Sequence, residues 1–175
     1  WLAFEFREHG GSLKWLHKAI VLSDAYRQSA ADRQECLTAD ADNRLLWRMN
    51  RQRLDAESIH DAVLSLSGRI DLKMGGPSAR QFHSSKGVHI TPNVDYLGFD
   101  PDAPANLRRS VYRFVFRTVP DPLMQALDCP DASQLAPRRE TSATALQALA
   151  MLNNRFLVRQ SEHIATNLKT SHLDL

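Results

Sequence analysis

The chain has 175 residues, of which 43% are hydrophobic and 24% charged, and this composition excludes a disordered or collagen-like chain. A domain of this length buries roughly 70% of the surface that its unfolded chain exposes, enough for a core without disulfides or metals. Lys and Arg total 22 against 20 Asp and Glu, a formal charge of +2, which argues against a nucleic-acid or acidic-membrane partner. Uninterrupted apolar runs are short, as at Ala19 to Leu22, so no segment is predicted to span a bilayer.

The N-terminal residues predict two amphipathic helices that are separated by a glycine pair. The first runs from about Trp1 to His9 and ends at Gly10-Gly11, because glycine adopts the left-handed conformation of a helix C-terminus at little cost. Ser12 is the expected N-cap of a second helix, from Leu13 to about Asp24, whose apolar residues are spaced to form one buried stripe. Residues 29–42 are polar, small and without period, which predicts a surface loop with room for a helical turn.

The strongest helical pattern covers residues 43–67. Its apolar residues recur at three, four and seven positions, which predicts one core-facing stripe with a break near Arg53. The stripe comprises Leu46, Met49, Ala56, Ile59, Val63 and Leu66. Asn43 is the expected cap at the start, Asp55 recaps the helix after the break, and Gly68 ends it.

The centre of the chain lacks helical periodicity. Residues 69–107 contain repeated Gly and Pro turn signals, and the best strand candidate among them is residues 88–90. Residues 109–117 fit either a strand or a helix, and their aromatic and β-branched residues favour the strand slightly.

A final helix is predicted from about Thr141 to His163, with Leu168 as an alternative end. The sequence therefore predicts one mostly α-helical, irregular domain over residues 1–175, with a long central loop and a small β element at about 88–90 and 109–117. The residues expected in its core are Leu46, Met49, Ile59, Val63, Leu149 and Leu152.

The densest charged cluster lies in and just before the helix that Asp55 caps. It comprises Arg48, Arg51, Arg53, Asp55, Glu57 and Asp61. Arg53–Glu57 and Glu57–Asp61 are both i, i+4 pairs, so Glu57 can lie between a cation and another carboxylate. Closely held carboxylates raise one pKa, as a general acid requires. The alternative, which we favour, is a solvated face of salt bridges.

Arginine outnumbers lysine 17 to 5. Because the planar guanidinium suits bidentate pairing with carboxylates, we expect an ion-pair network that ties the long loop to the helices. The functional alternative is a stripe that binds a polyanion, made of Arg108, Arg109, Arg113, Arg117, Arg138 and Arg139.

Metal and cofactor signals are weak. Cys36 and Cys129 stand alone, so neither a structural zinc site nor a haem attachment is predicted in this segment. We expect buried free thiols, with a disulfide as the alternative in an exported protein. The histidines form no His-Glu-x-x-His motif, and the sequence contains no nucleophile elbow and no phosphate loop.

Three sequence blocks resemble a known bacterial family. The first block combines Trp1-Leu2-Ala3, Ser12 to His17 and Tyr26 to Ser29. The second combines Asn43 to Arg48, Arg53 to Glu57 and Ser67-Gly68. The third combines Arg108 to Tyr112, Leu127 to Asp131, Gln147 to Leu149 and Leu152-Asn153. Together they resemble the C-terminal domain of large planctomycete proteins that also carry cytochrome c-like modules, known as domain of unknown function 1553.

The resemblance implies a mostly helical domain that follows another domain and often a c-type haem module. It also implies export to the periplasm or the cell exterior, because such haem modules mature outside the cytoplasm. It supplies no reaction. The chain departs from the family pattern at Gly11, Ala145 and Asn154, where Trp, Pro and Asp are common.

The first residues lead to two hypotheses of function. Trp1 to Phe6 read like the middle of an amphipathic helix, so we expect a chain that extends further towards its N-terminus. One hypothesis is an accessory domain without catalysis that packs against this upstream neighbour through an exposed apolar patch on its first helix. The other is part of an enzyme, for polysaccharide degradation or haem-linked redox chemistry, whose catalytic residues lie upstream.

Overall fold

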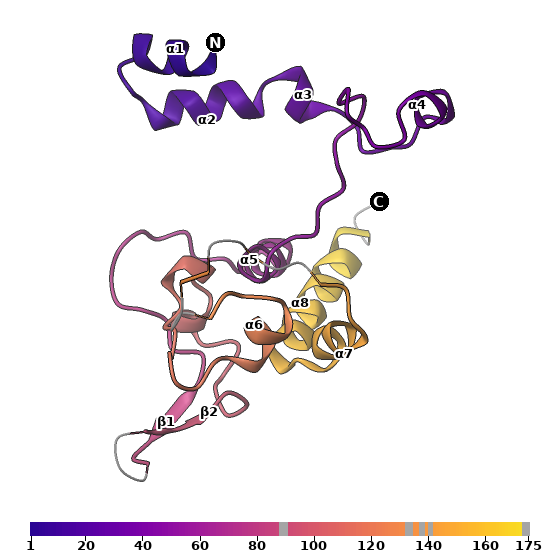
Figure 1. The fold of residues 1–175 in the computed structure, drawn as a ribbon. Coiled ribbons are helices and arrows are strands. Elements are labelled where there is room, and N and C mark those ends of the chain that lie inside the picture. The colour runs from indigo at the N-terminus through magenta and orange to yellow at the C-terminus, as the bar shows by residue number, and fades with distance from the viewer. Residues whose placement is uncertain (88–90, 132–134, 137–138, 140–141, 173–175) are drawn as a thin grey trace. The chain divides into compact units, whose positions relative to one another are not determined.

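The computed structural model describes residues 1–175 except 88–90, 132–134, 137–138, 140–141 and 173–175, and the side chains of residues 171 and 172. The chain forms two compact units, Trp1–Arg53 (unit 1) and Leu54–Leu175 (unit 2). Figure 1 shows the helices of both units. Among the described residues the fold is mostly helical with a small two-stranded sheet, and this confirms the predicted fold class.

Unit 1 consists of short helices. The predicted first and second helices are α1 (Leu2–Glu8) and α2 (Leu13–Val21), and they are followed by α3 (Asp24–Arg27) and α4 (Gln34–Ala39). Gly10 and Gly11 have φ of 67° and 70°, the left-handed conformation that ends α1. The Ser12 hydroxyl accepts the Trp15 N–H at 3.3 Å and caps α2 as expected. The predicted loop at 29–42 contains α4 as its helical turn.

The predicted helix over 43–67 is wrong in its first half. Asn43 and Leu46 have φ of 55°, which no α-helix contains. The Asn43 side chain holds this bend, because its Nδ2 donates to the Arg48 carbonyl at 2.8 Å and its Oδ1 accepts the Arg48 N–H at 3.2 Å. Asn43 is therefore a buried organiser of a loop and not a helix cap. The helix begins only after Arg53, close to the predicted break.

Unit 2 begins with α5 (Ala56–Leu66), capped by Asp55 as predicted and ended by Gly68 with φ of 69°. The elements that follow are β1 (His83–Ser85), β2 (Asn93–Asp95), the 3-10 helices η1 (Pro104–Asn106) and η2 (Ser110–Tyr112), α6 (Pro122–Ala126), α7 (Ala145–Asn153) and α8 (Arg155–His172). α8 contacts both α5 and α7, and α7 also contacts α6 (Figure 1).

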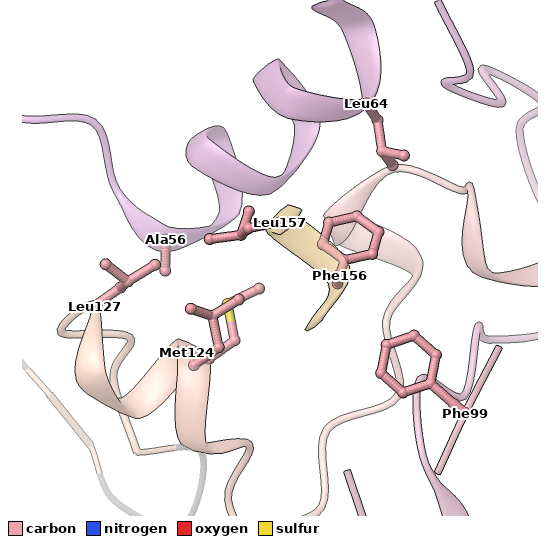
Figure 2. Packing of buried hydrophobic residues seen from close by; sticks show 8 residues of the cluster. Ala56, Leu64, Phe99, Met124, Leu127, Phe156 and Leu157 are labelled. Atoms are coloured by element: carbon pink, nitrogen blue, oxygen red, sulfur yellow. The ribbon is translucent and has the colours of Figure 1, made fainter. Parts of the chain in front are cut away.

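The core of unit 2 joins residues from α5, α6 and α8. It consists of Ala56, Leu64, Phe99, Leu123, Met124, Leu127, Phe156 and Leu157. Figure 2 shows Ala56, Leu127, Met124 and Leu157 close together. The predicted core residues Ile59 and Val63 pack against this cluster, and Met49 is half-buried in unit 1.

Several predicted core residues are exposed instead. Leu46, Leu149 and Leu152 are 56%, 54% and 73% exposed, and Leu66 at the end of the predicted stripe is 69% exposed. On α5 the buried face runs through Ala56, His60 and Leu64, each four residues from the next. On α7 the buried residue is Gln147, so this helix packs through a polar contact. The spacing therefore predicted helices at α5 and α7, but it assigned exposed residues of both helices to the buried face.

The predicted last helix is two helices. Asn154 has an extended backbone with φ of −70° and ψ of 121°, and it separates α7 from α8. Its Oδ1 accepts the Leu157 N–H at 3.1 Å, so it caps α8. The capping box of Thr144 and Gln147 starts α7.

The two strands of the small sheet lie close in sequence to the predicted strand at 88–90, but not at it. β1 and β2 pair antiparallel, with Ser84 opposite Val94. The predicted strand at 88–90 lies between them, outside the described residues. The strand favoured for 109–117 is wrong as a strand, because this segment starts with η2 and makes only isolated bridge contacts, such as Ala79 with Arg113. Two backbone hydrogen bonds of 2.8 Å hold that bridge, from the Ala79 N–H to the Tyr112 carbonyl and from the Phe114 N–H to the Ala79 carbonyl.

Candidate functional site

Three acidic residues of α5 or its cap line one polar pocket. The pocket has a volume of about 500 Å³, and we call it the α5 site. Its walls are Asp55, Glu57, Ser58, Asp61, Arg109, Ser110, Val111 and Arg139. Asp55 is positioned by its role as N-cap, because its Oδ1 accepts the Ser58 N–H at 2.7 Å. Glu57 lies in the first helical turn, where the helix dipole favours a negative charge.

Arg139 binds Glu57 with both arms of its guanidinium. Its Nη1 donates to Glu57 Oε2 and its Nη2 to Glu57 Oε1, each at 2.7 Å, and its Nη1 also lies 3.8 Å from Asp55. This bidentate geometry is the strongest form of an arginine–carboxylate pair. The hydrogen bonds from Arg139 lower the pKa of Glu57 although burial opposes the shift. The pKa of Asp55 is also lowered, mainly by its hydrogen bonds with Ser58.

Asp61 connects α5 to η2 and to a buried histidine. Its Oδ1 accepts the Ser110 N–H at 2.5 Å, and its Oδ2 accepts from Arg109 Nε at 3.3 Å. His60 Nδ1 lies 3.2 Å from Asp61 Oδ1. The carboxylate is therefore engaged by three donors from two segments of the chain.

The contacts of His60 define its tautomer. Gln81 Nε2 lies 3.0 Å from His60 Nε2 and also donates to the Asn106 carbonyl at 2.8 Å. Because an amide nitrogen only donates, His60 Nε2 accepts and Nδ1 carries the proton that goes to Asp61. The ring is 2% exposed and stacks on Phe156 with centroids 4.7 Å apart. Burial, with the charge of Arg113, lowers the pKa of His60 to about 4, so the ring is neutral at pH 7.

The chemistry of the α5 site is that of an ion-pair junction. A carboxylic general acid needs a raised pKa at neutral pH, whereas the pKa values of Asp55 and Glu57 are lowered. The arrangement therefore favours the interpretation of this cluster as a face of salt bridges. It ties residue 139, α5 and η2 together across long stretches of sequence.

A second ion cluster centres on Asp102, which lies just before η1 and binds side chains of α8. Asp102 binds Arg69 and accepts from Arg159 Nε at 2.6 Å, and His163 Nε2 lies 2.9 Å from it. Burial opposes the ionisation of Asp102, but the hydrogen bonds from His163, Arg159 and Arg69 outweigh it and hold the pKa of Asp102 well below its usual range. This cluster could not be predicted from the sequence, because its members lie 33 to 61 positions from Asp102 and share no motif.

The family assignment agrees with the sequence blocks. The sequence model of a family described as protein of unknown function (DUF1553) matches residues 1–174. The chain belongs to the DUF1553 family. No curated protein and no solved structure shows significant similarity to it.

The DUF1553 structure brings four of the predicted site residues together. Asp55, Glu57, Asp61 and Arg109 all line the α5 site. Glu57 is paired with Arg139, which lies 82 positions away, a partner that the sequence did not single out beside Arg53, four residues before Glu57. In the sequence, the excess of arginine over lysine was the only feature that predicted long-range ion pairs of this kind.

The other predicted site residues lie elsewhere. Arg108 donates to the carbonyls of Lys73, Gly75 and Pro77, and its guanidinium lies 3.8 Å from the centroid of the Tyr112 ring, so it holds the loop at 73–77. Arg48 and Arg53 belong to unit 1. There Arg48 Nε lies 3.4 Å from Asp32, and the Arg48 guanidinium lies over the Trp47 ring. Arg138 lies outside the described residues.

Metal, membrane and thiol features of the DUF1553 chain can be stated for the described residues. These residues contain no group of three or more His, Cys, Asp or Glu side chains that could hold a metal ion. No helix within the described part of the chain has the length and apolarity needed to cross a membrane. Cys36 and Cys129 are free and half-buried, and burial, with the charge of Glu57, raises the pKa of the Cys129 thiol.

Proposed function

We propose that this chain is an accessory, non-catalytic domain of a larger, exported bacterial protein, and that α1 and α2 dock on an upstream domain of that protein. A c-type haem module is the further companion that the family resemblance leads us to expect. The proposed location is the periplasm or the cell exterior.

The observation that carries the proposal is the exposed apolar surface of α1 and α2. Phe4 and Leu13 are 62% and 63% exposed, and α1, α2, α3 and α4 contain no buried residue. The exposed apolar residues of this surface also include Trp1, Leu2, Ile20 and Val21. Burying each such side chain against a partner is worth roughly 1.5–3 kcal/mol.

Helix length supports the same conclusion. α1 and α2 have 7 and 9 residues, and isolated helices shorter than about 12–15 residues are marginal in water. α1 contacts α2, and the His9 and Trp15 rings stack with centroids 3.9 Å apart, so the pair forms one surface. A packing partner would stabilise both helices by covering that surface.

The α5 site supports the non-catalytic part of the proposal. Its carboxylates are engaged by Arg139, Arg109 and backbone N–H groups, and the pKa shifts of Asp55 and Glu57 disfavour general-acid catalysis. These contacts support a structural role for the site. They give no support to hydrolysis of a polysaccharide within this segment.

The test compares this chain with the longer native protein that contains it. We expect the isolated chain to bind a hydrophobic dye such as anilinonaphthalene sulfonate and to self-associate in light scattering, because an apolar surface without its partner is left wet. A Phe4→Ser, Leu13→Ser double variant removes most of both signals, whereas Leu149→Ser, at a site 54% exposed on α7, is the matched control and keeps them. In the longer protein the amides of α1 and α2 exchange more slowly with deuterium than in the isolated chain.

The accessory role is contradicted if the isolated chain is monodisperse and binds no dye. It is also contradicted if α1 and α2 exchange equally fast in the longer protein. Fractionation of the native cells tests the proposed location separately, since the protein is expected outside the cytoplasm.

A further inference from the structure

A cavity of about 340 Å³ lies beside α6 in unit 2, next to the α5 site. Its volume falls at the lower end of the range for small-molecule pockets in proteins. Six of its lining residues come from the irregular chain between η2 and α6, and others come from η2, from α6 and from the segment after α6. Glu57, Ser110 and Val111 line both this cavity and the α5 site.

Aromatic rings form one side of the cavity. Tyr96, Phe114 and Phe116 line it, and Phe82 lies behind all three with ring centroids 5.5 to 5.7 Å away. Phe114 and Phe116 themselves lie 5.4 Å apart, edge to face. Such a wall offers both ring faces and ring edges to a flat aromatic ligand.

The charged groups of the wall whose contacts the structure gives are paired within the protein. Glu57 is held by Arg139, and Arg113 is paired with Asp121. Burial raises the pKa of Cys129, so its thiol is protonated at neutral pH. An ionic ligand would have to compete with these pairs, and the wall therefore favours a neutral one.

One polar group of the wall has no partner among the described residues. Arg113 Nε is buried in a side chain that is 11% exposed, and no hydrogen-bond acceptor in the described part of the chain reaches it. A buried donor without an acceptor costs about 1–3 kcal/mol. Because Arg113 lines the cavity, this donor lies beside the space that a ligand would occupy.

We propose that this cavity binds a small, neutral, planar aromatic molecule with a carbonyl oxygen, in which the rings stack on Phe114 and Phe116 and the oxygen accepts from Arg113 Nε. The site rests on unit 2 alone and is independent of the docking surface on α1 and α2. It adds a ligand-binding function to an otherwise accessory domain.

The probe for the test is 6-propionyl-2-(dimethylamino)naphthalene, a neutral aromatic ketone whose emission shifts to the blue in an apolar site. We expect saturable binding of one probe per chain. Val115 lines the cavity and is 62% exposed, so Val115→Trp is expected to fold and to put a bulky ring in the way of the probe. This variant is expected to weaken binding at least tenfold, whereas Val158→Trp, at a 44% exposed site outside the cavity, binds as the wild type does.

Two further measurements locate the probe. Arg113→Lys keeps the charge that pairs with Asp121 but removes Nε, so it is expected to weaken binding several-fold and to reduce the part of the spectral shift that comes from hydrogen bonding to the ketone. In a Cys36→Ser background, where Cys129 is the remaining thiol, a saturating probe is expected to slow alkylation of Cys129 by iodoacetamide several-fold.

Absence of saturable binding overturns the proposal. It is also overturned by equal binding in Val115→Trp and wild type, or by binding that leaves Cys129 unprotected, which would place the probe on another apolar surface. If Arg113→Lys fails to fold, the Val115→Trp and protection results decide the question.

Discussion

The helices of unit 1 contain no buried residue, whereas in unit 2 a single helix, α5, already has three: Ala56, His60 and Leu64. Unit 1 relies on local polar contacts, such as the Ser12 and Ser23 caps and the 2.6 Å hydrogen bond from Arg33 to the Trp47 carbonyl. Unit 2 joins distant segments through an apolar cluster and long-range ion pairs. In this sequence, helices therefore form both with an apolar core, as in unit 2, and without buried helix residues, as in unit 1.

The largest expected effect is in the core of unit 2. Phe156 is 3% exposed and stacks on His60, so Phe156→Ala should lower the free energy of unfolding by about 3–5 kcal/mol. Phe4→Ala, at a 62% exposed position in unit 1, should change it by less than about 0.5 kcal/mol. Urea denaturation followed by circular dichroism measures both. Equal losses would erase the distinction between the two units.

The second effect is a pH dependence that belongs to unit 2. The pKa of His60 is lowered from 6.5 to about 4 in the folded chain, so between these values the unfolded chain binds the extra proton. The contribution of neutral His60 to the free energy of unfolding is complete above pH 6.5. It declines by about 3 kcal/mol as the pH falls to 4. The lowered pKa values of Glu57 and Asp55 add to this loss at the acid end, because their stabilisation begins to be lost as the pH falls below their unfolded values of 4.5 and 3.8.

Denaturation at a series of pH values measures this slope. His60→Asn should flatten it even though the variant is less stable overall, and His83→Asn, at an exposed position on β1, should keep it. A wild-type stability that stays level from pH 6.5 to 4 would mean that His60 is not buried in its neutral form.

The third effect compares helix caps in the two units. Thr144→Ala removes the capping box of α7 in unit 2 and should cost about 1 kcal/mol of global stability. Ser12→Ala removes the cap of α2, and it should lower helicity slightly while leaving the main unfolding transition unchanged. A shift of that transition in Ser12→Ala would show that unit 1 unfolds together with unit 2.

The smallest effect concerns the bidentate pair in the α5 site. Glu57 and Arg139 side chains are 35% and 46% exposed, so water and salt screen their interaction. A double-mutant cycle with Glu57→Gln and Arg139→Gln should give a coupling energy of about 0.2–1 kcal/mol that shrinks in 1 M salt. A coupling that salt does not change would mean that the pair is shielded from solvent.

Local signals in the sequence predicted the helix ends well. Gly10 ends α1, Ser12 begins α2 and Asp55 begins α5, because capping depends on residues within one turn. The same local chemistry explains an error at Asn43, where a residue suited to a cap instead takes the left-handed conformation and organises a loop.

Long-range packing could not be predicted from the sequence. The apolar residues of α7 and of the predicted 43–67 helix fit a stripe, yet Leu46, Leu149 and Leu152 are exposed, because the burying partner is chosen by the tertiary fold. The acidic half of the α5 site was visible as a cluster on one helix. Its partner Arg139 was not, since no local rule connects residues 82 positions apart.

Amide hydrogen–deuterium exchange on the 175-residue chain tests the central contrast most directly. Amides in α5 and α8 should exchange slowly, at rates set by global unfolding, because these helices enclose the core of unit 2. Amides in α1 and α2 should exchange orders of magnitude faster, since these helices bury no residue. Equal protection of α1, α2, α5 and α8 would contradict the account, because α1 and α2 would then already have their packing partner within the chain.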